Sequence, residues 1–134
     1  MRLMTLVPAA LLAASLTVLI AHPSRATTDA APFTQQAFEA SQKQGQPILV
    51  QITASWCPVC AKQRPILSQL EDEPKFKNLV VYNIDFDTQK DQVRAMGAQK
   101  QSTLIVFNGT TEKGRSTGEI DPAAIQSLLA KTAE

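Results

Sequence analysis

Apolar runs of strand length alternate with amphipathic stretches of helix length through most of the chain. Residues 48–52, 79–84 and 103–107 are mostly apolar, which is typical of strands buried on both faces. An Asn-Gly pair at 108–109, a strong turn signal, follows the third run. A weaker fourth strand is expected near residues 114–117.

Helix signals separate these runs. Thr34 is expected to cap a first helix that ends at Gly45, because threonine is a favoured N-cap and glycine a favoured helix end. A second helix is expected over residues 57–70, and Pro65 inside it predicts a kink. The first apolar run therefore lies between two helices.

Two further helices complete the pattern. A short polar helix is expected over residues 87–95, and a last helix has Asp121 as its cap and Pro122 at its first position. A strand, a helix and another strand in succession form a parallel pair. The alternating order therefore predicts an α/β fold with a mixed sheet and helices on both sides.

Residues 1–26 have the pattern of an export signal. An apolar stretch over residues 3–21 is followed by a short polar segment, in which Ser24 and Ala26 suit the positions before a signal-peptidase cut. Cleavage after Ala26 leaves residues 27–134 as the mature domain. The alternative is an uncleaved membrane anchor, since the apolar stretch is just long enough to span a bilayer. Both alternatives predict a periplasmic or other extracytoplasmic domain in an oxidising compartment.

Composition and charge narrow the possible partners. The chain of 134 residues has room for one compact domain, and its formal net charge is +1. No run of like charges provides the electrostatic footprint that nucleic acid or an anionic membrane surface would need. We therefore expect no nucleic-acid partner, and we expect a monomer. The scarce reactive residues are two cysteines and one histidine, and the histidine lies in the leader.

The two cysteines form one motif, Trp56-Cys57-Pro58-Val59-Cys60, directly after a predicted strand and at the start of a predicted helix. Unpaired N–H groups and the helix dipole stabilise a thiolate in the first helical turn. The second thiol lies one turn later, within bonding reach. We therefore predict a redox-active pair with Cys57 as the exposed nucleophile and Cys60 as the buried resolving thiol.

Two other uses of the cysteine pair are weaker. A structural disulfide that closes so short a loop removes little chain entropy. A zinc site needs a full tetrahedral ligand set, and beyond the leader the chain offers two thiols and no histidine. Zinc would therefore require a dimer, and no metal ligands are assigned.

Acidic residues outside the motif are expected to be structural. Asp85 and Asp87 lie near a predicted strand end, where a carboxylate commonly caps the following helix. Glu71 belongs to an acidic group at residues 71–73 and is interpreted as part of a solvated helix exit.

The stretch at residues 48–65 resembles the strand, Trp-Cys-x-x-Cys site and helix of the thioredoxin superfamily, including the kinking proline five residues after the second cysteine. The resemblance covers about residues 33–132. It implies a thioredoxin fold and thiol–disulfide exchange with protein substrates. The family's usual first strand has no counterpart before Thr34, so we expect a short variant with about four mixed strands flanked by helices.

Two buried charges of many thioredoxins are replaced in this chain. The acid in the strand before the site falls on Gln51, and the lysine that accompanies it in the next strand falls on Val81. Because both are lost together, no buried charge is left unpaired. Cys60 then needs another base, such as water.

The family's cis-proline, which shapes the substrate groove, falls on Ser102. A cis bond before serine would cost about 2.5–4 kcal/mol, so we predict a trans bond and an altered groove. The altered groove makes the Ser102 hydroxyl a candidate hydrogen-bond donor to a thiolate. The predicted site-shaping residues are Trp56, Pro58, Val59, Gln101, Ser102 and Thr103.

Together these features predict an exported thiol–disulfide oxidoreductase that exchanges electrons with partner protein thiols or disulfides through Cys57 and Cys60. The chemistry needs no organic cofactor. In an oxidising compartment, a reductase needs a membrane partner to recharge it. The alternatives are a thioredoxin-fold module that binds Cu(I) or bridges a metal cluster across a dimer, and a scaffold whose cysteines are redox-idle.

Overall fold

The computed structural model describes residues 30–134, and the predicted leader, residues 1–26, lies outside this range. The strands are β1 (Ala31–Pro32), β2 (Pro47–Thr53), β3 (Val80–Asp85), β4 (Thr103–Asn108) and β5 (Thr111–Thr117). The helices are α1 (Gln35–Lys43), α2 (Pro58–Glu71), α3 (Lys90–Ala95) and α4 (Pro122–Ala130), with 3-10 turns at Pro74–Phe76 and Lys131–Ala133. Within the described range, no helix is both long enough and apolar enough to cross a bilayer.

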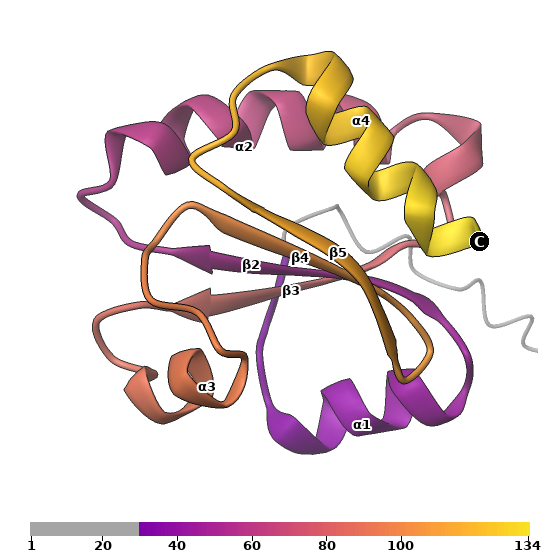
Figure 1. Ribbon diagram of the computed structural model, residues 1–134, viewed down its shortest axis with the longest axis horizontal. Coiled ribbons are helices and arrows are strands. Elements are labelled where there is room, and N and C mark those ends of the chain that lie inside the picture. The colour runs from indigo at the N-terminus through magenta and orange to yellow at the C-terminus, as the bar shows by residue number, and fades with distance from the viewer. Residues whose placement is uncertain (1–29) are drawn as a thin grey trace, which may run out of the picture.

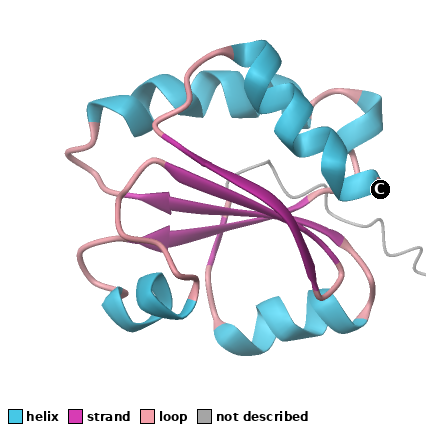
Figure 2. Ribbon diagram, viewed as in Figure 1, coloured by secondary structure: helices cyan, strands magenta, loops and turns pink. Residues whose placement is uncertain are grey.

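The strands form one mixed sheet in the order β1-β3-β2-β4-β5. Figure 2 shows the strands gathered between the helices. Strand β2 pairs in parallel with β3 and antiparallel with β4, and β4 pairs antiparallel with β5. Helices α2 and α4 cover one face of the sheet, and α1 and α3 cover the other (Figure 1). The predicted α/β class, with a mixed sheet and helices on both sides, is confirmed.

The sheet has five strands, so the expected number of about four is one too low. The additional strand β1 pairs in parallel with β3, with Ala31 opposite Tyr82. The N–H of Phe33 continues the pairing by donating to the carbonyl of Asn83 at 3.0 Å. A two-residue strand has no hydrophobic periodicity that a sequence pattern can reveal. It forms because the edge of β3 offers unpaired backbone groups.

The predicted helix caps at Thr34 and Asp121 are confirmed, whereas α3 starts later than predicted. The Asp85 carboxylate accepts hydrogen bonds from the N–H groups of Asp87 at 3.0 Å and Thr88 at 2.8 Å, and from the Thr88 hydroxyl at 2.8 Å. These bonds hold the chain in a turn after β3, so the helix begins only at Lys90. The bonds from Thr88, and to a smaller extent the one from Asp87, lower the pKa of Asp85.

Strand β2 lies between two hydrophobic cores. Its residues Ile48, Val50 and Ile52 belong to a cluster that includes side chains from α1 and α3. Leu49 belongs to a second cluster on the opposite face, with side chains from α2 and α4. All four β2 side chains are fully buried, as expected for a central strand covered on both faces. The position at which the chain leaves β2 and enters α2 is therefore well defined.

Tyr82 ties α1 to the sheet. The Tyr82 hydroxyl donates to the Ala37 carbonyl at 2.9 Å. The Ser41 hydroxyl lies 2.8 Å from the Tyr82 oxygen and donates to it. The Tyr82 ring packs edge-on against Phe33 and Phe38. The tyrosine thus links the helix before β2 to the strand beside β2.

We expect Tyr82→Phe to lower the free energy of unfolding by about 1–2 kcal/mol, because two hydrogen bonds lose their shared partner. Urea unfolding at neutral pH measures the change. Ser41→Ala is the matched control, since it removes only one of the two bonds and should cost less. A larger loss for Ser41→Ala than for Tyr82→Phe would show that the tyrosine hydroxyl is not the main tie.

Candidate active site

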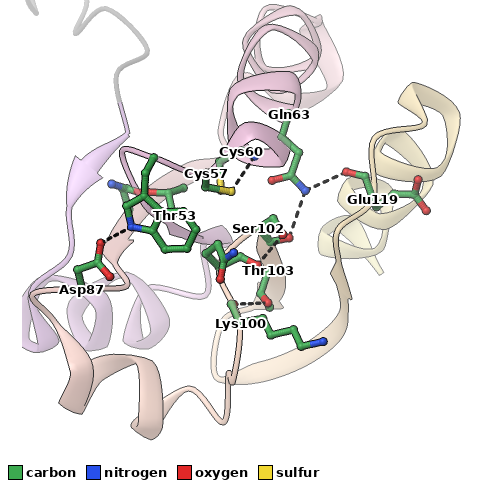
Figure 3. Close-up of a disulfide and its surroundings, with 12 residues drawn as sticks. Thr53, Cys57, Cys60, Gln63, Asp87, Lys100, Ser102, Thr103 and Glu119 are labelled. Carbon is green, nitrogen blue, oxygen red and sulfur yellow. Dashed lines mark hydrogen bonds between the residues drawn. A yellow bond between two sulfur atoms is a disulfide. The ribbon is translucent and has the colours of Figure 1, made fainter.

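The cysteine pair lies where β2 leads into α2 (Figure 3). Cys57 is the N-cap of α2, and its sulfur accepts the N–H of Cys60 at 3.0 Å. The two residues form a disulfide, with Cα atoms 5.3 Å apart. Pro58 occupies the first helical position, where its missing N–H costs no helical hydrogen bond. The N–H donor and the helix start stabilise negative charge on the Cys57 sulfur once the disulfide is reduced.

The predicted difference in exposure between the two cysteines is wrong for this oxidised form. Cys57 and Cys60 are each only 3% exposed. They form a small cluster with Ala54, and Val59 and Phe86 pack against it. The disulfide holds the Cys57 sulfur against Cys60, so both sulfurs are covered. The two cysteines differ in position, because Cys57 caps α2 and Cys60 lies within its first turn.

Trp56 stands at the surface beside the disulfide. Its side chain is 58% exposed, and its indole N–H donates to Asp87 Oδ2 at 2.7 Å. The indole therefore lies largely in solvent and belongs to neither of the two large hydrophobic clusters. The contact with Asp87 was not predicted from the sequence, since it depends on how the turn after β3 approaches the loop after β2.

The predicted site-shaping residues Gln101, Ser102 and Thr103 lie where the chain enters β4, whereas Pro58 and Val59 lie at the start of α2. The peptide bond before Ser102 is trans, as predicted, and Ser102 has a φ of +60°. Its hydroxyl donates to the Gln101 carbonyl at 2.5 Å. The suggested bond from Ser102 to a thiolate stays a prediction, because the two cysteines form a disulfide here. Thr103 is buried, and its hydroxyl donates to the Lys100 carbonyl at 2.8 Å.

Gln63 was not predicted from the sequence as a site residue. It lies one turn after Cys60 on α2 and is 2% exposed. Its side-chain N–H₂ group donates to the carbonyl oxygens of Ser102 at 3.2 Å and Glu119 at 2.8 Å (Figure 3). The available signal was a glutamine at an inward-facing position of the helix, where the pattern otherwise has apolar residues such as Leu67.

A cleft of about 400 Å³ runs along α2 and is lined in part by Cys60. Gln51, Thr53 and Asn83 line it from the sheet, and the Thr53 hydroxyl donates to Asn83 Oδ1 at 2.5 Å. Strands β2 and β3 therefore present hydrogen-bonding groups but no charge to the cleft. Gln51, at the position of the family's buried acid, leaves this side of the cleft neutral, whereas Arg64 lines the cleft from α2.

Glu71 is buried in the wall of this cleft, and its interpretation as part of a solvated helix exit is wrong. It is 8% exposed and takes part in no ion pair within residues 30–134. Helical spacing turns Glu71 to the same face of α2 as Cys60 and Leu67, so it faces the sheet. Burial, with a smaller contribution from the negative charge of Asp72, raises the pKa of Glu71 to about 7.

Glu71 should make stability depend on pH between its ordinary pKa of 4.5 and about 7. A raised carboxyl pKa means that the folded state favours the protonated form, so stability is lost as the pH rises through this window, by at most about 3 kcal/mol. We expect Glu71→Gln to match the wild type near the lower end and to be more stable above the upper end. Urea unfolding at a series of pH values measures this.

Asp72→Asn is the control for the Glu71 prediction, because it changes a neighbouring charge outside the cleft. It should remove only a small part of the pH dependence. Parallel stability curves for the wild type and Glu71→Gln would contradict the raised pKa.

Known proteins match this chain over most of its length. The thioredoxin family model matches residues 29–131. Thioredoxin from Bacillus subtilis (strain 168) is 30% identical over 98 residues, which is 73% of this chain and 92% of that protein. Thioredoxin Asp f 29 from Aspergillus fumigatus is 26% identical over 114 residues, which is 85% of this chain and 100% of that protein. The crystal structure of Trxlp from Edwardsiella tarda EIB202 aligns with a TM-score of 0.72 and 38% identity, covering 74% of this chain and 96% of that one.

The chain therefore belongs to the thioredoxin family. It has the thioredoxin fold, with a five-stranded mixed sheet. It is a thiol–disulfide oxidoreductase whose redox pair is Cys57 and Cys60. The predicted fold class and the predicted class of activity are confirmed.

Proposed function

We propose that the protein works outside the cytoplasm and passes electron pairs between its cysteine pair and the disulfides or thiols of partner proteins. The observation that carries this proposal is the Cys57–Cys60 bond in the first turn of α2, beside the exposed Trp56. The signal-like pattern of residues 1–26 supports export.

In the reducing direction, the Cys57 thiolate attacks one sulfur of a partner disulfide. A bond forms between Cys57 and that sulfur, the partner's S–S bond breaks, and the second partner sulfur leaves as a thiolate. Cys60 then loses its proton and attacks the Cys57 sulfur, which releases the first partner sulfur. Two electrons have moved to the partner, and the Cys57–Cys60 disulfide remains. The same steps in reverse oxidise a partner dithiol.

The proton of Cys60 has to leave during the second step. The cleft along α2 is lined by Cys60 and by the neutral residues Gln51, Thr53 and Asn83 of the sheet. The Glu71 carboxyl also lines the cleft but lies about three helical turns beyond Cys60. Solvent in this cleft is therefore the acceptor that we assign, in place of the acid that many thioredoxins carry at the position of Gln51.

Export places a further demand on the cycle. No glutathione pool keeps thiols reduced outside the cytoplasm. A reductase there has to be recharged by an electron donor in the membrane, and an oxidase has to pass its electrons to an acceptor. Our proposal includes a membrane partner of this kind and a monomeric protein.

We expect Cys60→Ser, once reduced, to accumulate a mixed disulfide with a protein disulfide such as insulin, because the resolving thiol is absent. Cys57→Ser should trap none, and both variants should reduce insulin at least about 100-fold more slowly than the wild type. Mass spectrometry after acid quenching measures the adduct. Trapping by Cys57→Ser alone would reverse the two roles, and trapping by neither variant would contradict the mechanism.

The reduction potential of the Cys57–Cys60 couple decides the direction of electron flow. We would measure it on residues 27–134 against glutathione and dithiothreitol buffers. A value near about −270 mV indicates a reductant, and one near about −120 mV indicates an oxidase.

Metal content on the same preparation tests the metal-binding alternative. Within residues 30–134 no group of three or more His, Cys, Asp or Glu side chains gathers as a metal site, so this part of the chain offers a soft metal the two thiols of the cysteine pair. Stoichiometric metal, together with a cysteine couple that does not cycle, would replace the proposed oxidoreductase with a binding module.

A further inference from the structure

Ser102 has a backbone conformation that serine rarely adopts. Its φ of +60° lies in the left-handed region, where the side chain of an L-residue crowds the backbone. Such a residue persists only where the surrounding contacts hold it in place. It occupies the position at which the superfamily has its groove-shaping proline, in the surroundings of the disulfide (Figure 3).

Gln63 supplies contacts that hold this residue. Its N–H₂ group donates to the Ser102 carbonyl at 3.2 Å and to the Glu119 carbonyl at 2.8 Å. The N–H of Gly118 donates to the same Ser102 carbonyl at 3.0 Å. A side-chain amide has two N–H donors, and Gln63 uses both of them while being 2% exposed.

The chemistry of this contact is specific to a glutamine. A leucine of similar size would leave the Ser102 and Glu119 carbonyls without this donor. Because Ser102 is only 7% exposed, water has little access to replace the lost bond to its carbonyl. A glutamate would set acceptor oxygens against two other acceptors. A shorter asparagine keeps the amide but lacks the reach to bond both carbonyls from the same position on α2.

We propose that Gln63 is a positioning residue for partner recognition, which holds the segments at 100–103 and 118–120 against the helix that carries the cysteines. This inference rests on the proposed function. Gln63 and Cys60 lie one turn apart on α2, so the two loops keep a constant position relative to the reacting sulfurs.

The partner that this arrangement fits is an extended polypeptide segment containing a disulfide. Such a segment is long enough to lie along the backbone at Gln101 and to reach Ile120, which is 43% exposed and follows Glu119 directly. A small-molecule disulfide offers fewer groups to these two loops than an extended segment does. Gln63 therefore affects protein substrates more than small ones.

The test compares the activity of the mature protein, residues 27–134, on two substrates. Insulin supplies a polypeptide disulfide, and 5,5′-dithiobis(2-nitrobenzoate) supplies a small one. For Gln63→Leu we expect the ratio of kcat/KM for insulin to kcat/KM for the small disulfide to fall about tenfold, chiefly through KM, as the loss of two hydrogen bonds predicts. Gln69→Leu, an exposed glutamine on the same helix, is the matched control and should leave the ratio unchanged.

Gln63→Asn is the second variant, in case the leucine variant does not fold, and circular dichroism establishes which variants are folded. It should lower the same ratio by a smaller factor. If a folded variant loses activity on both substrates equally, Gln63 has a general structural role and the inference is wrong. If neither variant folds, Gln63 is a core residue and the inference is also wrong.

A failure of the proposed function has a different signature. In that case the wild type would reduce neither insulin nor the small disulfide.

Ser102→Gly provides an independent check on the strained loop, because glycine adopts a positive φ freely. With Gln63 in place this variant should be at least as stable as the wild type to urea, whereas Ser102→Pro should be less stable because proline requires a negative φ. The opposite order would contradict the strained conformation at Ser102.

Discussion

The central position of β2 is the constraint on which the site depends. This strand pairs along its length with β3 on one side and with β4 on the other. Its alternate side chains are buried in two different cores, so a shift of one residue would move each set to the wrong face. The chain leaves β2 at Thr53, and Cys57 caps α2 shortly afterwards. The register that protects the two cores therefore also sets the position of the sulfurs.

Packing around α2 decides which groups share the environment of the cysteines. One face of this helix carries Cys60, Gln63 and Glu71 toward the sheet. Opposite them, Gln51 and Asn83 are paired in the strand register and supply polar groups without charge. The sheet side of the cleft is thus neutral, whereas α2 contributes Arg64 close to Cys60 and the Glu71 carboxyl at its far end. Where many thioredoxins carry a buried acid, this chain has amides and hydroxyls, with Thr53 bonded to Asn83 and Gln63 bonded to two backbone carbonyls.

The pattern of apolar and polar residues predicted an element correctly where the element is long and where a capping residue marks its end. The apolar run at 48–52 became the central strand, and Thr34 and Asp121 became helix caps as predicted. Strand β1 was missed because two residues are too few to show an alternation of apolar and polar side chains. The start of α3 was misplaced because the Asp85 side chain bonds the turn that precedes the helix. In both cases the outcome depends on hydrogen bonds that a hydrophobic pattern does not encode.

The sequence by itself determined the class of fold, the reactive pair and the trans bond before Ser102, because each depends on neighbouring residues: periodicity, the Cys-x-x-Cys spacing at a helix start, and the intrinsic cost of a cis bond. Only the tertiary structure decided that Asp87 contacts Trp56, that Glu71 is buried, and that Gln63 holds two distant loops. The physical reason is that hydrogen-bond partners and burial depend on which segments the sheet brings together. A polar residue in a sequence shows which bonds it is able to make, and the fold decides which partners lie within reach.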